Sequence, residues 1–447
     1  MKGVLVAAIL VVALVLRVAS AERTPYRPVN DAGSYLTLAS YIAHTGDYSL
    51  RRSPGSGAGG TRGPSAYYAP GYPYFLALVD LIDGHAVRRG PAIGPARISQ
   101  AVLGTITVAL IGLVAFELFG ETAGVIALGL AAVYPVLTEL SGTLVAENLL
   151  TPLVLAALYT ALRSRRARST ATRYGWVAGT GVLTGLAVLT HENAALILLA
   201  LIPAVGTAGA GEKSFKPRSL AAPALLVGLT ALTILPWTIR NAVEMHSFIP
   251  VSDETGITLV GTYNVASAHD PQVPYKWRIF YGIPGERTLI RESPHLTEPQ
   301  IGAKLQSQAL NYISKHPFSP LVVAYHNTLR MFELEGTFAW IASASAISLT
   351  TPVARLGVIS FWVLCLLALG GLATRLGRSA PGWVWIIPVL LALSVILVNV
   401  ETPRFREPVD PFLVLLASAG LATVVERVRG RLRRAPVVGE TGHPVPA

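Results

Sequence analysis

The chain has 447 residues, of which 52% are hydrophobic and only 14% are charged, and its mean hydropathy is +0.52. These values exclude an ordinary soluble domain and are typical of a polytopic membrane protein. The single cysteine, Cys365, lies inside an apolar run, which leaves no basis for a disulfide framework or a thiolate metal site. The formal net charge of +11 fits either a nucleic-acid partner or basic loops beside a membrane, and the positions of the charges decide between the two.

Apolar runs of about 17 to 25 residues, the length that crosses a bilayer as a helix, recur along the whole chain. We therefore expect an all-α polytopic membrane protein. Its ten transmembrane helices are predicted near residues 3–20, 97–118, 122–138, 144–162, 174–190, 193–209, 219–237, 352–374, 382–399 and 409–425.

The short connections between these helices are basic on one side only. Residues 163–173 read RSRRARSTATR, and residues 212–218, 375–378 and 426–434 are also rich in lysine and arginine. By the positive-inside rule these segments are cytoplasmic, so both termini are predicted to be cytoplasmic and the charge balance needs no nucleic acid. Arginine outnumbers lysine 30 to 6, which is typical of a GC-rich bacterial genome, and we expect a bacterial plasma membrane.

The N-terminal helix has a second interpretation. Its short apolar core followed by ASAE (residues 19–22) resembles a secretory signal peptide with a small-residue cleavage site. Arg17 interrupts the run just before that site, which is unusual for a signal peptide. Cleavage would leave the orientation of every later helix unchanged.

Two long segments, residues 21–96 and 238–351, are predicted to lie on the opposite, extracytoplasmic side. In the first segment, residues 53–65 are rich in Gly, Pro and Ser and are expected to be mobile. Residues 29–49 and 71–84 have apolar side chains at helical spacing but are too short to span, so we predict amphipathic helices along the membrane surface. In the second segment an amphipathic helix is predicted at 297–313.

These features divide the chain into four predicted parts. Residues 1–237 form a transmembrane module that includes the first extracytoplasmic loop, and residues 238–351 form a second extracytoplasmic region. Residues 352–425 contain the C-terminal transmembrane helices, and residues 426–447 form a basic cytoplasmic tail.

Several strings occur in an order and spacing that point to a known family. They are Asp31 just after the first helix, YYAPGYPYFLAL (67–78), LVAENLLTPLVLAALYTALR (144–163), GTGVLTGLAVLTHENAALILL (179–199), PWTIRNAVEMHSFIP (236–250) and RFREPVDPFLVLLA (404–417). With these strings the chain resembles the GT-C glycosyltransferase superfamily, and within it the dolichyl-phosphate-mannose-protein mannosyltransferases (family 39) and the aminoarabinose transferases. Two departures leave the sugar and the acceptor open: His191 stands where the family commonly has Lys or Arg, and Glu147 where Asp is frequent.

The resemblance implies an inverting transfer of a sugar from a polyprenyl-phosphate donor to an acceptor hydroxyl on the extracytoplasmic side, with catalytic roles for Asp31 and Glu147. The acceptor hydroxyl must lose its proton as it attacks, and a carboxylate is a natural base. The family assigns that role to the acid of the first loop, Asp31, which could instead be the N-cap of a helix beginning at Ala32. Glu147 lies in an apolar stretch, where an ionised carboxylate is costly unless it is paired or functional.

Six further residues are candidates for binding the substrate or its phosphate: Tyr68, His191, Glu192, Arg240, Arg404 and Arg406. Guanidinium groups hold phosphate oxygens bidentately, but arginines at this depth also suit snorkelling toward lipid headgroups. Tyr68 could stack on a sugar or serve as an interfacial anchor. His191 and Glu192 have the alternative reading of ordinary interfacial polar residues.

A divalent cation (Mg²⁺, Mn²⁺ or Ca²⁺) held by Asp31 and Glu147 is suggested only by analogy, because no two histidines have the spacing of a recognised metal motif. The expected partners are the polyprenyl-phosphate sugar, a hydroxyl acceptor on a glycan, lipid or protein of the cell envelope, and membrane lipids.

Two other classes of function stay open. A transporter or flippase of a lipid-linked sugar would place ionisable residues near the bilayer midplane between broken helices, whereas the charges here are predicted at the outer helix ends. A noncatalytic assembly protein would keep the same fold without the chemistry.

Overall fold

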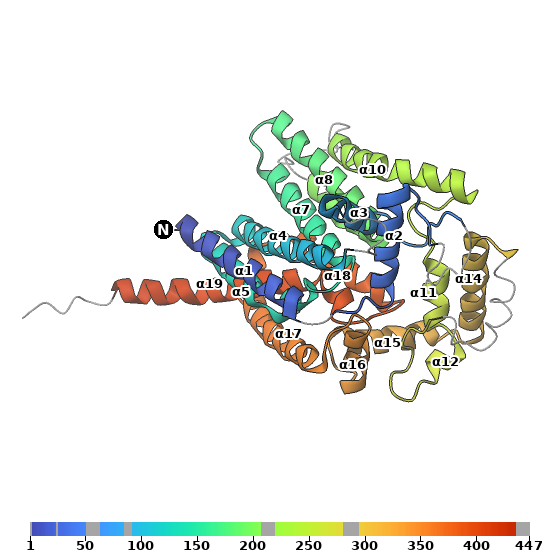
Figure 1. The fold of residues 1–447 in the computed structure, drawn as a ribbon. Coiled ribbons are helices and arrows are strands. Elements are labelled where there is room, and N and C mark those ends of the chain that lie inside the picture. The colour runs from blue at the N-terminus through green and yellow to red at the C-terminus, as the bar shows by residue number, and fades with distance from the viewer. Residues whose placement is uncertain are drawn as a thin grey trace, which may run out of the picture.

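The computed structural model describes residues 2–23, 26–50, 63–84, 92–206, 220–279 and 295–434, and within these ranges the chain is all-α without a β-strand. The predicted mobile residues 53–62, the basic connection 212–218 and residues 435–447 of the tail lie outside the described residues. Figure 1 shows a bundle of helices, and at the end away from the N-terminus it shows α11 (Thr255–Thr262), α12 (Val265–Ala268) and α14 (Glu298–Lys315).

Helices lie at all ten positions that were predicted to span a bilayer. They are α1 (Lys2–Arg23), α4 (Ile93–Phe119), α5 (Glu121–Val133), α7 (Glu147–Arg166), α8 (Thr170–Thr190), α9 (Leu198–Gly206), α10 (Ala221–Met245), α17 (Thr351–Leu372), α18 (Gly382–Ile396) and α19 (Asp410–Arg434). Within the described ranges, five of them (α1, α4, α10, α17 and α19) are long and apolar enough to cross a membrane. The count of ten spans therefore stays a prediction.

The apolar run at 122–138 forms two helices instead of one. α5 ends at Val133 and the short α6 (Pro135–Leu140) follows, because Pro135 has no N–H to continue the helical hydrogen bonds. Arg17 of α1 is fully buried and donates to the carbonyls of Ala131 and Ala132, at 3.0 and 3.1 Å, which lie at the end of α5. The arginine that interrupts the N-terminal apolar run thus satisfies backbone carbonyls at the C-terminal end of α5.

The bundle joins helices from both ends of the sequence. α4 packs against α1, α5 and α7, α8 packs against α7 and α10, and α19 packs against α17 and α5. The close approach of α17 and α19 depends on Gly371, where a Cβ would collide with the carbonyl oxygen of Leu416. The last helices therefore complete the same core that the first helices begin.

The two long segments between spanning helices contribute a second group of helices. α2 (Asp31–Thr45), α3 (Gly71–Asp83) and α14 confirm the three predicted short helices, and α14 begins with a capping box between Thr297 and Gln300. The same group contains α15 (Ser319–Met331) and α16 (Thr337–Ser345). A cluster of buried apolar side chains joins α2, α3, α10, α11 and α14; it includes Tyr35, Tyr68, Tyr72, Trp237, Ile257 and Ile301. This cluster fixes the start of α2, and with it Asp31, against the membrane bundle.

Candidate active site

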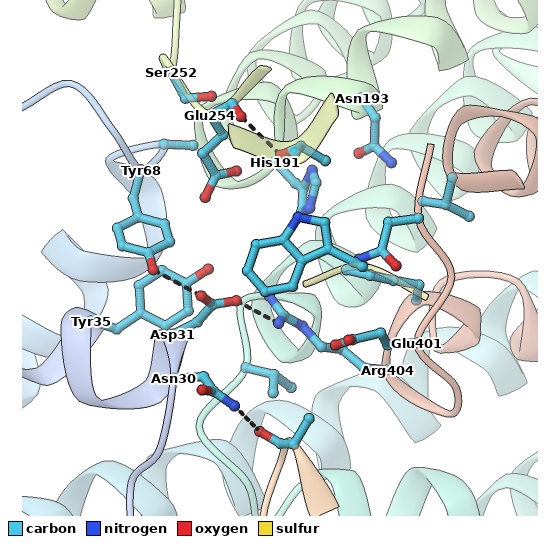
Figure 2. Close-up of a pocket in the computed structure, with 18 of the residues that line it drawn as sticks. Asn30, Asp31, Tyr35, Tyr68, His191, Asn193, Ser252, Glu254, Glu401 and Arg404 are labelled. Atoms are coloured by element: carbon cyan, nitrogen blue, oxygen red, sulfur yellow. Dashed lines mark hydrogen bonds and ion pairs between the residues drawn. The ribbon is translucent and has the colours of Figure 1, made fainter. Parts of the chain in front are cut away.

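A cavity of about 280 Å³ lies where the first loop, the end of α8, the start of α11 and the turn before α19 meet (Figure 2). Its polar lining is rich in side chains that can form hydrogen bonds: Asn30, Asp31, Tyr35, Tyr68, Thr190, His191, Glu192, Asn193, Ser252, Glu254, Thr255, Thr258, Ser394, Asn399, Glu401 and Arg404. Five of the residues singled out in the sequence therefore meet here: Asp31, Tyr68, His191, Glu192 and Arg404. A concave site with converging polar groups is the expected form of a small-molecule site.

Asp31 is held from two sides and faces the cavity. α2 begins at Asp31, and its N-cap is Asn30, whose side chain makes no capping bond, so the alternative reading of Asp31 as the N-cap is wrong. Instead Oδ1 accepts from the Tyr68 hydroxyl at 2.8 Å and Oδ2 accepts from Arg404 Nη1 at 2.6 Å. The side chain of Asp31 is still 34% exposed. Its carboxylate is thus oriented by two donors and remains accessible from the cavity.

Burial and the charge of Asp31 raise the pKa of the Tyr68 phenol well above its ordinary value. The phenol therefore stays protonated and keeps donating to the carboxylate. Tyr68 is itself buried and packs against the rings of Tyr35 and Tyr67. This packing favours a positioning role for Tyr68 over the predicted alternative of a membrane-interface anchor.

Arg404 joins the two predicted catalytic acids. It lies in the 3-10 turn η7 (Arg404–Arg406), and its Nε donates to both oxygens of Glu147 at 2.9 Å while Nη1 donates to Asp31. Burial lowers the pKa of Arg404, but the charges of Glu147 and Asp31 outweigh this effect and raise it above its ordinary value. Within the described part of the chain, Nη2 of Arg404 donates no hydrogen bond, and Arg404 lines the cavity. The guanidinium therefore stays charged with one nitrogen left for a ligand.

Glu147 supports the site from behind. It is the first residue of α7, is almost fully buried and does not line the cavity. The cost of burying its charge, which drew attention to it in the sequence, is offset by Arg404. Its position is that of a residue that orients Arg404.

His191 and Glu192 follow the end of α8, and both line the cavity. Glu192 accepts from the Ser252 hydroxyl at 2.7 Å, which ties this turn to the segment before α11. The Nδ1 atom of His191 is buried and has no hydrogen-bond partner in the described ranges. The next residue, Asn193, donates to Ser394 of α18 at 2.8 Å, so the turn is held on two sides.

Glu254 is a cavity residue that the sequence reasoning missed. It directly precedes α11 and its side chain lines the cavity beside Asp31 and Glu192. Burial, together with the negative charges of Asp31 and Glu192, raises the pKa of the Glu254 carboxyl well above its ordinary value. Nothing in the string SDETG (252–256) marks this residue, because consecutive polar residues between helices are usually solvated.

Arg240 does not line the cavity. Its Nη1 donates to the carbonyl of Ser65 at 2.6 Å and its Nη2 to the carbonyl of Tyr48 at 3.2 Å. Its guanidinium also lies 4.8 Å from the centre of the Trp237 ring. These contacts hold the first loop against α10 and do not support the predicted role in phosphate binding.

Arg406 also lies away from the cavity, although it is only two residues from Arg404. It is fully buried, donates to Glu333 at 2.7 Å and to Asp410 at 3.1 Å, and lies over the ring of Phe361. Three residues make one turn of a 3-10 helix, so residues two apart point in different directions. The structure gives Arg406 structural partners and no access to a ligand in the cavity.

The suggested metal site does not fit the observed donor set. Asp31 and Glu147 share the Arg404 guanidinium, which occupies the position that a bridging cation would need. Among the described residues, no group of three or more His, Cys, Asp or Glu side chains could hold a metal ion. Asp31 and Glu147 therefore hold a guanidinium group between them in the position suggested for a metal ion.

Comparison with known proteins gives the fold an identity. Residues 68–237 match the family model described as dolichyl-phosphate-mannose-protein mannosyltransferase, and no curated protein matches the chain. The structure is similar to an Archaeoglobus fulgidus oligosaccharyltransferase in complex with Zn and sulfate, at 17% identity over 96% of this chain and 50% of that chain, with a TM-score of 0.52. It is also similar to AglB of the same organism in complex with an inhibitory peptide and a dolichol-phosphate, at 14% identity over 98% and 52% of the chains, with a TM-score of 0.54. The chain has the GT-C glycosyltransferase fold.

ArnT from Cupriavidus metallidurans bound to undecaprenyl phosphate gives 16% identity over 95% of this chain and 78% of that chain, with a TM-score of 0.43. The chain spans about half the length of the oligosaccharyltransferases that it matches.

The GT-C fold confirms the resemblance seen in the sequence strings and, with the five apolar helices, a multi-pass membrane protein. The match at 68–237 includes Tyr68, Glu147, His191 and Glu192. Asp31 and Arg404 lie outside that match. Only the GT-C fold brings these two residues together at the cavity.

Proposed function

We propose that this protein is an inverting glycosyltransferase that moves a sugar from a polyprenyl-phosphate donor to an acceptor hydroxyl. The observation that carries the proposal is Asp31, which faces the cavity and is oriented by hydrogen bonds from Tyr68 and Arg404. AglB, which has the same fold, was solved in complex with a dolichol-phosphate, and this supports a lipid-phosphate donor here. The acceptor is a hydroxyl of a glycan, lipid or protein.

In the proposed reaction the acceptor oxygen attacks the anomeric carbon from the face opposite the phosphate. A new bond forms between the acceptor oxygen and the anomeric carbon, the bond from that carbon to the phosphate oxygen breaks, and the polyprenyl phosphate leaves with the electron pair. The acceptor proton passes to the carboxylate of Asp31. Attack from the opposite face inverts the configuration at the sugar carbon.

Arg404 has two roles in this scheme. Its Nη1 holds Asp31 in place, and its remaining nitrogen, Nη2, binds an oxygen of the phosphate as negative charge accumulates on that oxygen. Glu147 fixes the guanidinium plane through Nε, so that Nη2 keeps its direction. His191 and Glu192, which also line the cavity, are proposed to contact the acceptor or the sugar.

The site is proposed to lie on the extracytoplasmic side of a bacterial plasma membrane. Asp31, His191 and Arg404 all lie at helix ends or turns opposite the basic connections of the sequence, such as residues 163–173 and 375–378. The positive-inside rule places those connections, and both termini, in the cytoplasm.

The test follows the release of label from a panel of radiolabelled polyprenyl-phosphate sugars by membranes that contain wild-type protein or Asp31→Asn. The asparagine keeps the size of the side chain and removes the base, and loss of general-base catalysis is expected to lower turnover by about 10²- to 10⁴-fold. Label that leaves the lipid only with wild-type protein identifies the donor. Identical traces for both proteins across the panel would refute the proposal and favour a transport or assembly role.

A further inference from the structure

The charges that line the cavity are strongly unbalanced. Four carboxyl groups line it, those of Asp31, Glu192, Glu254 and Glu401, whereas the only arginine or lysine among the described lining residues is Arg404. Arg404 is already paired with Asp31 and with Glu147 behind it. A negatively charged sugar would therefore lie near carboxylates such as Asp31 and Glu192, with no further arginine or lysine among the described lining residues to pair with it.

Glu254 differs from the other three carboxyl groups because its carboxyl has no hydrogen-bond or ion-pair partner among the described residues. Asp31 accepts from Tyr68 and Arg404, Glu192 accepts from Ser252, and Glu401 lies 3.5 Å from the ammonium group of Lys276. No hydrogen bond to the Glu254 carboxyl occurs in the part of the chain that the structure describes. An unpaired carboxyl group at a cavity wall is available to a ligand.

The backbone around Glu254 is nevertheless fixed. The N–H of the preceding Asp253 donates to the carbonyl of Ala66 at 2.9 Å, and the Glu254 carbonyl accepts from the N–H and the hydroxyl of Thr258 at 2.9 and 2.8 Å. These bonds tie the residue to the first loop on one side and to α11 on the other. Figure 2 shows Glu254 in the same part of the cavity as Asp31 and Tyr68.

The surroundings of Glu254 favour its neutral form. Asp31 and Glu192 both place negative charge near it, and Arg404, the cation that acts on it, is shared with two other carboxylates. A neutral carboxyl group donates one hydrogen bond and accepts another. A sugar hydroxyl also has one hydrogen-bond donor and can accept, so it can pair with both atoms of the carboxyl group, whereas a sugar carboxylate can only accept.

We propose that Glu254 is a specificity-determining residue that binds a hydroxyl group of the transferred sugar, and that the cavity takes an uncharged sugar and rejects an anionic one. This inference rests on the proposed transfer from a polyprenyl phosphate and adds the class of sugar to it. It also distinguishes Glu254 from Asp31, which acts on the acceptor proton.

The experiment compares Glu254→Gln, Glu254→Ala and the wild-type protein in the transfer assay, with Glu244→Gln as the matched control on the exposed surface of α10. Glutamine mimics the protonated carboxyl group that the raised pKa of Glu254 favours, so its kcat/KM for a neutral-hexose donor is expected within about threefold of wild type. Alanine removes the hydrogen bonds, and about a tenfold loss of kcat/KM, mainly as a higher KM, is expected. The control is expected to behave as wild type, and thermal unfolding of each variant monitors the fold.

The same assay uses polyprenyl phosphates that carry a neutral hexose, a hexuronate or an amino sugar. The hexuronate is expected to give a kcat/KM at least about tenfold below that of the neutral hexose. A preference for the hexuronate or for the amino sugar, wild-type activity of Glu254→Ala, or a Glu254→Gln variant as impaired as Glu254→Ala would overturn the inference. The last result, together with a preference for the amino sugar, would show that the carboxylate binds a cation.

The two proposals fail in different ways. If the wild-type protein releases no sugar from any donor, or if Asp31→Asn is as active as wild type, the proposed function fails and the sugar class fails with it. If release depends on Asp31 but the Glu254 variants or the donor series show one of the contrary patterns, only the role of Glu254 is refuted.

Discussion

Removing Arg404 and Glu147 together is expected to destabilise the protein by less than the sum of the two single losses. The side chains of Arg404 and Glu147 are 8% and 2% exposed, and Nε of Arg404 lies 2.9 Å from both Glu147 oxygens. In Arg404→Ala the Glu147 carboxylate stays buried without its partner, which costs about 3–5 kcal/mol. In Glu147→Gln the guanidinium keeps Asp31, so the loss is one charge-assisted interaction of about 1.5–3 kcal/mol.

The double variant Glu147→Gln/Arg404→Ala contains neither buried charge. Its loss of unfolding free energy is therefore expected to be smaller than the sum of the two single losses by about 1.5–3 kcal/mol, the range of coupling found for residues in contact. The free energy of unfolding of the wild type, the two single variants and the double variant is measured on purified proteins in mixed micelles. Increasing sodium dodecyl sulfate unfolds each protein, and tryptophan fluorescence follows the transition.

The control is Arg163→Ala. Arg163 pairs with Glu117, but its side chain is 41% exposed and Glu117 keeps a second partner in Arg166, so a loss below about 1 kcal/mol is expected. Single losses that add within about 0.5 kcal/mol in the Glu147 and Arg404 cycle would refute the account of Arg404 as the counter-ion of a buried carboxylate.

Two further predictions concern the partners of the site. Tyr68→Phe removes the hydroxyl that donates to Asp31 at 2.8 Å. We expect kcat to fall about three- to tenfold while the melting temperature stays unchanged. A wild-type kcat would contradict the positioning role of Tyr68. Glu298, buried against Ser65 and the N–H of Ala66, has its pKa raised by burial from 4.5 to about 7. Because the folded state then binds more protons than the unfolded state between these values, stability is expected to fall by at most about 3 kcal/mol as the pH rises from about 4.5 to about 7. Denaturation curves across this range check the slope, which Glu298→Gln should reduce; an equal slope in the variant would show that other groups cause it.

The fold was largely predictable because hydrophobic runs define membrane helices before any tertiary contact is considered. Helices occur at all ten predicted positions. The prediction of a single helix over residues 122–138 was wrong, because Pro135 interrupts the backbone hydrogen bonds and divides the run into α5 and α6. It also left Arg17 unexplained, because the carbonyls that Arg17 binds belong to α5, more than a hundred residues away in the chain.

The site was predictable in part, for physical reasons that differ between residues. Asp31, Glu147 and Arg404 stand out because a charge beside or inside an apolar run is costly unless it has a partner. Glu254 does not stand out in the sequence, because its neighbours Ser252, Asp253 and Thr255 are also polar and suggest a solvated segment. Its unusual environment arises only from the fold, which places it at the cavity wall. Arg240 and Arg406 look equivalent to Arg404 in composition, and only the direction of each side chain separates them.

The pairing of Glu147 with Arg404 also bears on the biogenesis of the protein, because 257 positions of sequence separate the two residues. While ribosomes are still translating the C-terminal third, α7 enters the membrane with a carboxylate whose counter-ion has not been synthesised. A chain that ends before Arg404 therefore contains Glu147 without its counter-ion, and burial of that carboxylate stays costly until the turn before α19 has been made. The same arrangement leaves Asp31 without the Arg404 guanidinium until the turn before α19 is in place, so the orientation of this carboxylate depends on one of the last parts of the chain to be made.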